Sequence, residues 1–318
     1  MQNNKYAAAV ATVRAKENEL LQRPYFEQLV SLPTYESAVK FLLDAGISNA
    51  DKENFADERL QGVWQDITEI CGKDTLGFLV IKNDFHNIKA AIKCSFAGET
   101  PDAYFEKPCL VDTAILKNSA QQKDFSLMPS FLSNAASLGY SLLASTMNGQ
   151  AFDMLIDKES INGIIKAASI AECDLADEIA KLTAAQINIK IALRASRMNT
   201  ADAVLQNAFS ECELIDVAAL KKAALKSTDD VLNYISENGF KYLAEAFKQS
   251  ASAFELAVDN AISQATENAR YTAFGLAPII GYYIAKETEC KNLRLVINAK
   301  RAGVSAEKIK ERLREIYV

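Results

Sequence analysis

Three asparagines, each followed two positions later by a cation, form the most regular polar pattern in this chain. They lie in fifteen-residue windows that align without a gap, at 84–98, 185–199 and 289–303. The asparagines are Asn87, Asn188 and Asn292, and the cations are Lys89, Lys190 and Arg294. An asparagine amide donates and accepts hydrogen bonds at once, and a cation can pair with a carboxylate. Such a repeated pattern is more typical of a binding or mechanical part than of a catalyst.

Two interpretations of these polar positions are open at the level of sequence. In the first, each asparagine forms hydrogen bonds across a helix crossing while the neighbouring cation extends to solvent. In the second, Lys89, Lys190 and Arg294 repeat around a pseudo-threefold axis and form a protein-interface surface.

The windows also agree in their apolar residues and in how they end. Apolar residues occupy the positions one, four and five after each asparagine, which is one stripe of a helix. The last residues are Gly98, Asn199 and Gly303. Glycine and asparagine tolerate a left-handed backbone just past a helix end. We therefore expect three long helices, each followed by a left-handed residue.

The spacing of the windows predicts a triplicated chain. Equivalent asparagines are 188 − 87 = 101 and 292 − 188 = 104 residues apart. A repeat of about 100 residues divides the chain into helical units at 1–110, 111–213 and 214–318. Three similar units suggest a pseudo-threefold body.

Helix breakers are scarce, since the 318 residues include only 12 Gly and 6 Pro. Helical periodicity predicts helices over 5–22, 35–44 and 51–71, two within 112–147, and long antiparallel helices over 152–199. Further helices are expected after Gly239, from Pro278 to Ala302, and over 306–317. No stretch alternates as a strand does, so the predicted fold is all-α.

The chain offers no recognisable catalytic set. Its one histidine is His86, which we expect to be a helix residue at a unit interface or surface. Asp229 and Asp230 lack the further acid of a DDxxD motif and are expected in the first turn of a helix. The charged run at 286–294 is more typical of a solvated helix face. Neither GxxxxGK(S/T) nor GxGxxG occurs, so no catalytic, cofactor-binding or metal site is predicted.

The charge balance bears on possible partners. The formal net charge is −6 and no long basic run occurs, which argues against nucleic acid and against an anionic membrane surface as partners. The most apolar stretch, 274–285, is too short to span a bilayer, so no direct membrane insertion is expected. The six cysteines contain no CxxC pair, which fits reduced thiols in a cytoplasmic protein.

Three segments of the chain resemble one family of proteins. They are YAAAVATVRAKENELL near the N-terminus, NDFHNIKAAIKC at 83–94, and the last 41 residues, which begin PIIGYYIAKETECKNLRLVINAKRAG. Together they are similar to the C subunits of bacterial and archaeal V/A-type ATPases (ATP synthases), whose eukaryotic counterpart is the d component of the vacuolar ATPase. The resemblance extends over essentially the full length, although the second window has Ala185 where the others have Asp84 and Glu289.

The resemblance implies an all-helical, funnel-shaped protein of three similar domains on the rotor of a rotary ion pump. Its role would be that of a non-catalytic central-stalk socket between the axle subunits D and F and the membrane ring of proteolipid subunits. Nucleotide hydrolysis or synthesis, coupled to proton or sodium transport, would take place elsewhere in the complex. The chain would be peripheral to the membrane through that complex.

Two other classes of protein compete with this interpretation. One is an all-α metal-dependent enzyme that uses Asp and Glu residues, which the lack of a paired acidic motif disfavours. The other is a free-standing helical adaptor, but its repeats would normally contain 30–50 residues instead of about 100.

Overall fold

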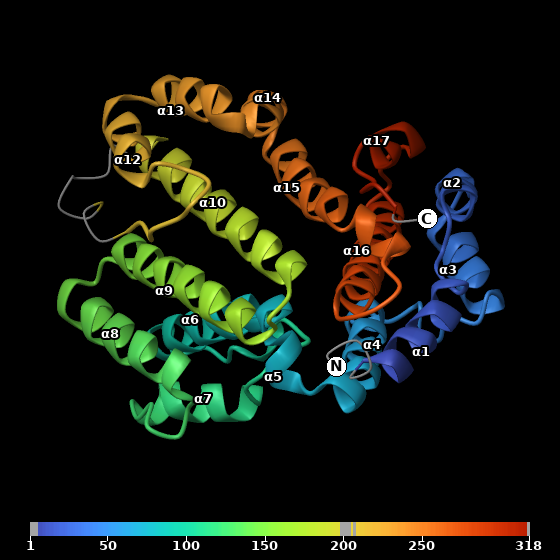
Figure 1. Cartoon of the computed structure of the whole chain (residues 1–318), viewed down its shortest axis with the longest axis horizontal. Helices are drawn as coiled ribbons and strands as arrows, with labels where there is room; N and C mark the ends of the chain where they lie inside the picture. Colours follow the sequence, from blue (N-terminus) through green and yellow to red (C-terminus); the bar gives the residue numbers. More distant parts are fainter. Residues whose placement is uncertain (1–5, 198–204, 206–207, 317–318) are drawn as a thin grey trace. The chain divides into compact units, whose positions relative to one another are not determined.

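The computed structural model describes residues 6–197, 205 and 208–316 (Figure 1). Within these residues every regular element is helical and no strand occurs, so the all-α prediction is confirmed. The long helices are α1 (Ala7–Glu17), α2 (Arg23–Ser31), α3 (Tyr35–Asp44), α4 (Phe55–Cys71), α6 (Ile81–Ala97), α7 (Thr113–Gln122), α8 (Ser130–Thr146), α9 (Gly149–Ile170), α10 (Asp174–Arg197), α12 (Val217–Lys226), α13 (Thr228–Ile235), α14 (Lys241–Gln249), α15 (Ala251–Ala265) and α16 (Ala277–Arg301). The shorter elements are α5 (Lys73–Leu76), η2 (Gly77–Leu79), η3 (Asp102–Tyr104), η4 (Ser236–Phe240), η5 (Glu267–Tyr271) and α17 (Ala306–Lys310).

The chain folds into two compact units. The terminal unit comprises Met1–Gly72 and Glu245–Val318, and the central unit comprises Lys73–Ala244. The first two windows therefore lie in the central unit, whereas the third lies in the terminal unit. The division into three sequence units and their pseudo-threefold arrangement stay predictions.

The central unit is built on the two helices that carry the first two windows. α9 packs against α6, α8 and α10, while α7 packs on α6 and α12 packs on α10. The predicted apolar stripe lies in the core, since Ile88, Ile92, Ile189 and Ala192 are all 0% exposed. The pattern of one, four and five residues after each asparagine thus marks the buried face.

α6 and α9 approach closely at Gly163. A Cβ atom at this position would lie 2.7 Å from Cε2 of Phe85, whose side chain is itself buried. The glycine is therefore required by packing in the middle of a 22-residue helix.

The Gly163→Ala variant is expected to be less stable by about 1–3 kcal/mol, because the added methyl group overpacks the contact with Phe85. Helix propensity alone predicts the opposite, a gain of up to about 1 kcal/mol. Gly62→Ala is the matched control, since nothing lies within 4 Å of a Cβ atom there and Gly62 is also inside a helix. Urea unfolding measures both variants, and a stabilised Gly163→Ala protein would contradict the close packing.

The terminal unit is organised around α16, a helix of 25 residues. α4, α1 and α15 pack against it, and α2 and α3 also contact it. The indole of Trp64 on α4 meets the ring of Tyr283 edge to face, with 5.7 Å between the ring centroids. Both side chains are 1% exposed, and buried aromatic pairs of this kind contribute strongly to core stability.

Two of the three predicted helix ends lie in the described residues. Gly98 has a φ of +73° and Gly303 a φ of +68°, both left-handed as expected from the windows. In each case the next residue donates a hydrogen bond five residues back: Glu99 to the Cys94 carbonyl and Val304 to the Ala299 carbonyl, both at 2.9 Å. Asn199 lies outside the described residues.

Three helices are markedly shorter than the sequence predicts. The helix expected over 5–22 already ends at Glu17. The helix expected over 306–317 ends at Lys310, because the main chain of Arg314 is held by Asn292 and cannot continue the helix. The long helix expected after Gly239 is divided at Ser250, whose hydroxyl accepts from the Ala253 amide and starts α15. No helix in the described ranges combines the length and apolar character needed to cross a bilayer.

Candidate protein-interaction site

The three repeated asparagines perform the same task in the structure. Each is 0% exposed, and each forms two reciprocal hydrogen bonds with the main chain of one residue further along the sequence. We call these three pairs the asparagine clamps: Asn87 with Glu106, Asn188 with Ser210, and Asn292 with Arg314. The partner residue follows the asparagine by 19, 22 and 22 positions respectively.

The geometry of the clamps explains why asparagine occupies this position. The Nδ2 atom of Asn87 donates to the Glu106 carbonyl at 2.9 Å, and the Glu106 amide donates to Oδ1 of Asn87 at 2.7 Å. The corresponding distances at Asn292 and Arg314 are 3.1 and 2.9 Å. An amide side chain is the group that supplies one donor and one acceptor on the same planar end. It therefore satisfies both main-chain groups, the amide and the carbonyl, of a non-helical residue in the segment that follows the end of the helix.

This arrangement corrects one of the two interpretations of the asparagines. They do not pair across a helix crossing, because each partner is a main-chain group outside the helices. The clamp ties the segment after the helix back to the helix itself.

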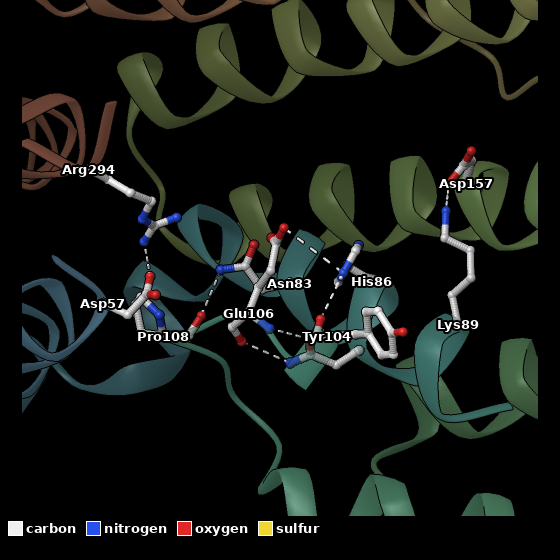
Figure 2. A network of polar contacts seen from close by, with 10 residues as sticks. Asp57, Asn83, His86, Lys89, Tyr104, Glu106, Pro108, Asp157 and Arg294 are labelled. Atoms are coloured by element: carbon white, nitrogen blue, oxygen red, sulfur yellow. Dashed lines mark hydrogen bonds and ion pairs between the residues drawn. The ribbon is translucent and has the colours of Figure 1, made fainter. Parts of the chain in front are cut away.

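The first clamp is reinforced by two neighbouring side chains on α6. Asn83 donates to the Pro108 carbonyl at 2.8 Å (Figure 2). Asp84, which is 0% exposed, accepts hydrogen bonds from the amides of Leu110 at 3.1 Å and Val111 at 2.8 Å. Burial raises the pKa of Asp84 to about 6, although these main-chain donors favour the charged form.

The raised pKa of Asp84 makes the stability of the central unit depend on pH, and the direction of that dependence can be worked out. Its pKa of about 6 in the folded protein exceeds the value of about 3.9 for an unfolded chain, so the folded state binds the proton more tightly. Relative to Asp84→Asn, the wild-type free energy of unfolding is expected to rise by on the order of 2–3 kcal/mol as the pH falls from about 7 to about 4. Denaturant unfolding of both proteins across this range checks the prediction, and parallel pH curves would contradict it.

The predicted interface cations have acidic neighbours. Nζ of Lys89 lies 2.6 Å from Oδ1 of Asp157, and Arg294 pairs with Asp57 (Figure 2). Lys190 is not without a partner either. The side chain of Arg294 is nevertheless 42% exposed and that of Lys89 is 21% exposed. Lys89 and Lys190 belong to the central unit and Arg294 to the terminal unit.

The other residues that the sequence analysis considered as catalytic or metal-binding candidates have structural partners. The imidazole Nε2 of His86, at 43% side-chain exposure, donates to the Tyr104 carbonyl at 3.1 Å. Asp229 and Asp230 lie in the first turn of α13, where the Ser227 hydroxyl caps the Asp230 amide at 3.0 Å, as predicted. Across the described residues, no group of three or more His, Cys, Asp or Glu side chains is placed to hold a metal ion.

The charged run at 286–294 contains a buried network that the sequence did not predict. Glu289 accepts from Arg59 at 2.8 Å, from Lys286 at 3.1 Å and from the Leu21 amide at 2.9 Å. The side chains of Lys286 and Glu289 are 4% and 3% exposed, so the expectation of a solvated face is wrong for these two residues. The signal available in the sequence was the shared window position of Asp84 and Glu289. Both are buried acids that accept main-chain amides.

A second buried group joins the third clamp to α15. Asp259 pairs with Lys291 at 2.9 Å and with Arg314 at 2.6 Å. Burial alone would raise the pKa of Asp259, but the two cations outweigh it and lower the pKa to about 2. Arg314 is thus held by its main chain and its side chain together.

The described residues form an all-helical protein in which three long helices each carry the same asparagine clamp. The sequence profile of the ATP synthase (C/AC39) subunit family matches residues 9–312 of the chain. The chain therefore belongs to the ATP synthase (C/AC39) subunit family.

Three relatives are similar to this chain along nearly its whole length. The C subunit of the A-type ATP synthase of Methanobrevibacter smithii is 25% identical, covering 97% of this chain and 88% of the relative. The C subunit of the V-type sodium ATPase of Enterococcus hirae is 22% identical, covering 96% and 97% respectively. The C subunit of the A-type ATP synthase of Methanocaldococcus jannaschii is 24% identical, covering 97% and 86%.

Proposed function

We propose that this chain is a non-catalytic central-stalk subunit of a V/A-type rotary ATPase. In this role it is a socket that couples the axle subunits D and F to the membrane ring of proteolipid subunits. The observation that carries the proposal is the family match over residues 9–312, together with relatives named as C subunits of A-type and V-type enzymes.

The asparagine clamps support a mechanical role of this kind. Torque passes through a socket only if its helices and the segments between them resist displacement, and a broad interface serves this better than a pocket. Each clamp ties the segment that follows a long helix to that helix through two hydrogen bonds from a fully buried asparagine. The same device occurs at each of the three windows, which fits a part that is loaded at several places.

Reconstitution from purified subunits tests the proposal. The D and F axle pair is expected to bind the proteolipid ring in the presence of this chain and to lose that binding in its absence. ATP hydrolysis by the catalytic subunits should then drive ion transport only when the chain is included. Full coupling without the chain would contradict the proposal.

The interface role of Lys89, Lys190 and Arg294 belongs to the same proposal. Replacing all three by glutamine is expected to slow association with the axle pair or the ring, with the largest effect at low ionic strength, because cations at a rim steer encounter. Glutamine avoids placing a like charge against Asp157 and Asp57.

The matched control replaces three exposed lysines elsewhere, Lys40, Lys166 and Lys248, by glutamine. Interferometry across a salt series, beside a thermal melt, measures both triple variants. If the variant that lacks Lys89, Lys190 and Arg294 is folded and binds as well as the wild type, these three cations contribute only to packing.

A further inference from the structure

Positive charge is concentrated on two neighbouring helices of the central unit. α9 packs against both α6 and α10 and carries two acids one turn apart, Asp153 and Asp157. The second parts of α6 and α10, residues 85–97 and 186–197, contain no acid and five cations: Lys89, Lys93, Lys190, Arg194 and Arg197. This concentration contrasts with the net charge of −6 for the whole chain.

Three of these cations meet at the two acids of α9. Nζ of Lys89 lies 2.6 Å from Oδ1 of Asp157 (Figure 2), and Nη1 of Arg194 lies 3.7 Å from Oδ2 of the same carboxylate. Lys93, one turn after Lys89, lies 2.6 Å from Oδ1 of Asp153. One carboxylate therefore brings cations from two helices together, and three cations share two acids. We call these five residues the cation cluster.

Two of the three cations reach further into solvent than the acids do. The side chains of Lys93 and Arg194 are 43% and 49% exposed, whereas those of Asp153 and Asp157 are each 22% exposed. Ion pairs at this level of exposure are weak, because water and salt screen them. The cluster therefore presents positive charge to solvent above two recessed acids.

The stability of the helices does not account for this arrangement. Cations in the last turn of a helix complement its dipole, which explains Arg194 and Arg197 on α10. The last turn of α6 contains no basic residue, so Lys89 and Lys93 have no such role. Like charges four residues apart on one helix repel each other. Pairing with α9 requires one cation for each acid, and the cluster contains a third.

The balance of charge in the cluster identifies the kind of partner. Three cations exceed two acids by one, and a single carboxylate neutralises that difference. A nucleic acid or an anionic lipid surface presents a dense array of phosphates and requires a larger excess of cations. The recessed acids Asp153 and Asp157 would also repel such an array. A protein segment supplies carboxylates one at a time, and an arginine guanidinium is well suited to bind them.

We propose that the cation cluster binds an acidic segment of another protein chain. The inference deepens the proposed function and rests on it for the existence of a protein partner. It states the chemistry of that partner and adds Lys93 and Arg194 to the interface. One carboxylate of the segment pairs with Arg194 above Asp157, and a second pairs with Lys93.

A labelled decaglutamate peptide tests the site, with fluorescence anisotropy as the readout and the full chain as the binding protein. Measurements are made at about 0.1 M ionic strength, where charges more than about 10 Å apart are largely screened. Lys93→Gln/Arg194→Gln is expected to weaken binding about tenfold, because two exposed charge contacts are lost. Lys123→Gln/Lys166→Gln is the matched control, since it removes the same charge from exposed positions of the central unit. Its affinity should stay within about twofold of the wild type.

Removal of the recessed acids is expected to act in the opposite direction. Asp153→Asn/Asp157→Asn should tighten peptide binding at least about threefold, because the cations no longer share their charge with carboxylates of the chain itself. Glu178→Gln/Glu237→Gln makes the same change in net charge at exposed positions of the central unit and should leave the affinity unchanged. A thermal melt shows that each variant is folded. A cation cluster that served packing alone would show no gain.

Three results would overturn the proposal. The first is an equal loss of affinity in the lysine control, which would show that net charge alone attracts the peptide. The second is a wild-type chain that does not bind the peptide at about 1 mM. The third is tighter binding of decathymidylate or phosphatidylserine vesicles than of the peptide, which would assign the cluster to phosphates. In each case the central-stalk role still stands, because reconstitution tests that role separately without the peptide.

Discussion

Replacing Asn188 by alanine is expected to destabilise the central unit by on the order of 2–4 kcal/mol. The change removes both hydrogen bonds to Ser210 and leaves its buried amide and carbonyl groups without these partners. Because the asparagine is 0% exposed, water cannot simply replace it. Denaturant unfolding combined with hydrogen exchange measures the effect, since the Ser210 amide lies outside the helices and its protection should depend on Asn188.

Equivalent changes at the other clamps extend this experiment. Asn87→Ala should expose the Glu106 amide within the central unit, and Asn292→Ala should expose the Arg314 amide within the terminal unit. Asn134→Ala is the control, because Asn134 is an exposed residue of α8 and its loss should change stability by less than about 0.5 kcal/mol. Similar losses at Asn134 and Asn188, or unchanged exchange at Ser210, would contradict the clamp.

The clamps show which part of the site follows from sequence. The windows predict α6, α10 and α16 and their buried faces, because apolar periodicity and cap residues act within a few turns of one helix. The partners Glu106, Ser210 and Arg314 are of three different residue types. They can differ because each asparagine bonds only to the main chain of its partner. A contact that uses main-chain groups on the far side leaves no signal in residue identity.

Buried contacts between a helix and its neighbours could not be predicted from the sequence either. Gly163 looks like a weak point in a long helix, and only its position against Phe85 shows that packing requires it. Lys286 and Glu289 look like a surface pair three residues apart, and only the tertiary fold places them among Arg59 and the Leu21 amide. In both cases the decisive neighbour is distant in sequence, beyond the reach of helical periodicity.

The buried network on α16 leads to the second large expected effect. Glu289→Ala should destabilise the terminal unit by about 3–5 kcal/mol, because it leaves Lys286 buried without its counter-charge. Arg59 also loses its partner, but its side chain is 29% exposed and can be partly solvated. The Leu21 amide loses its acceptor as well, which adds the cost of an unsatisfied main-chain donor.

A double variant separates the charge from the packing at this site. In Lys286→Met/Glu289→Leu both charges of the buried pair are replaced by apolar groups of similar size, a change that is often neutral when a whole ion pair is removed. The double variant is therefore expected to regain most of the stability lost in Glu289→Ala, with a remaining deficit of about 1–2 kcal/mol from the Leu21 amide. Urea unfolding of the wild type and both variants measures this recovery. If the double variant is as unstable as Glu289→Ala, an unpaired buried lysine is not the cause of the loss, and the contacts of Glu289 with Arg59 and Leu21 must account for it instead.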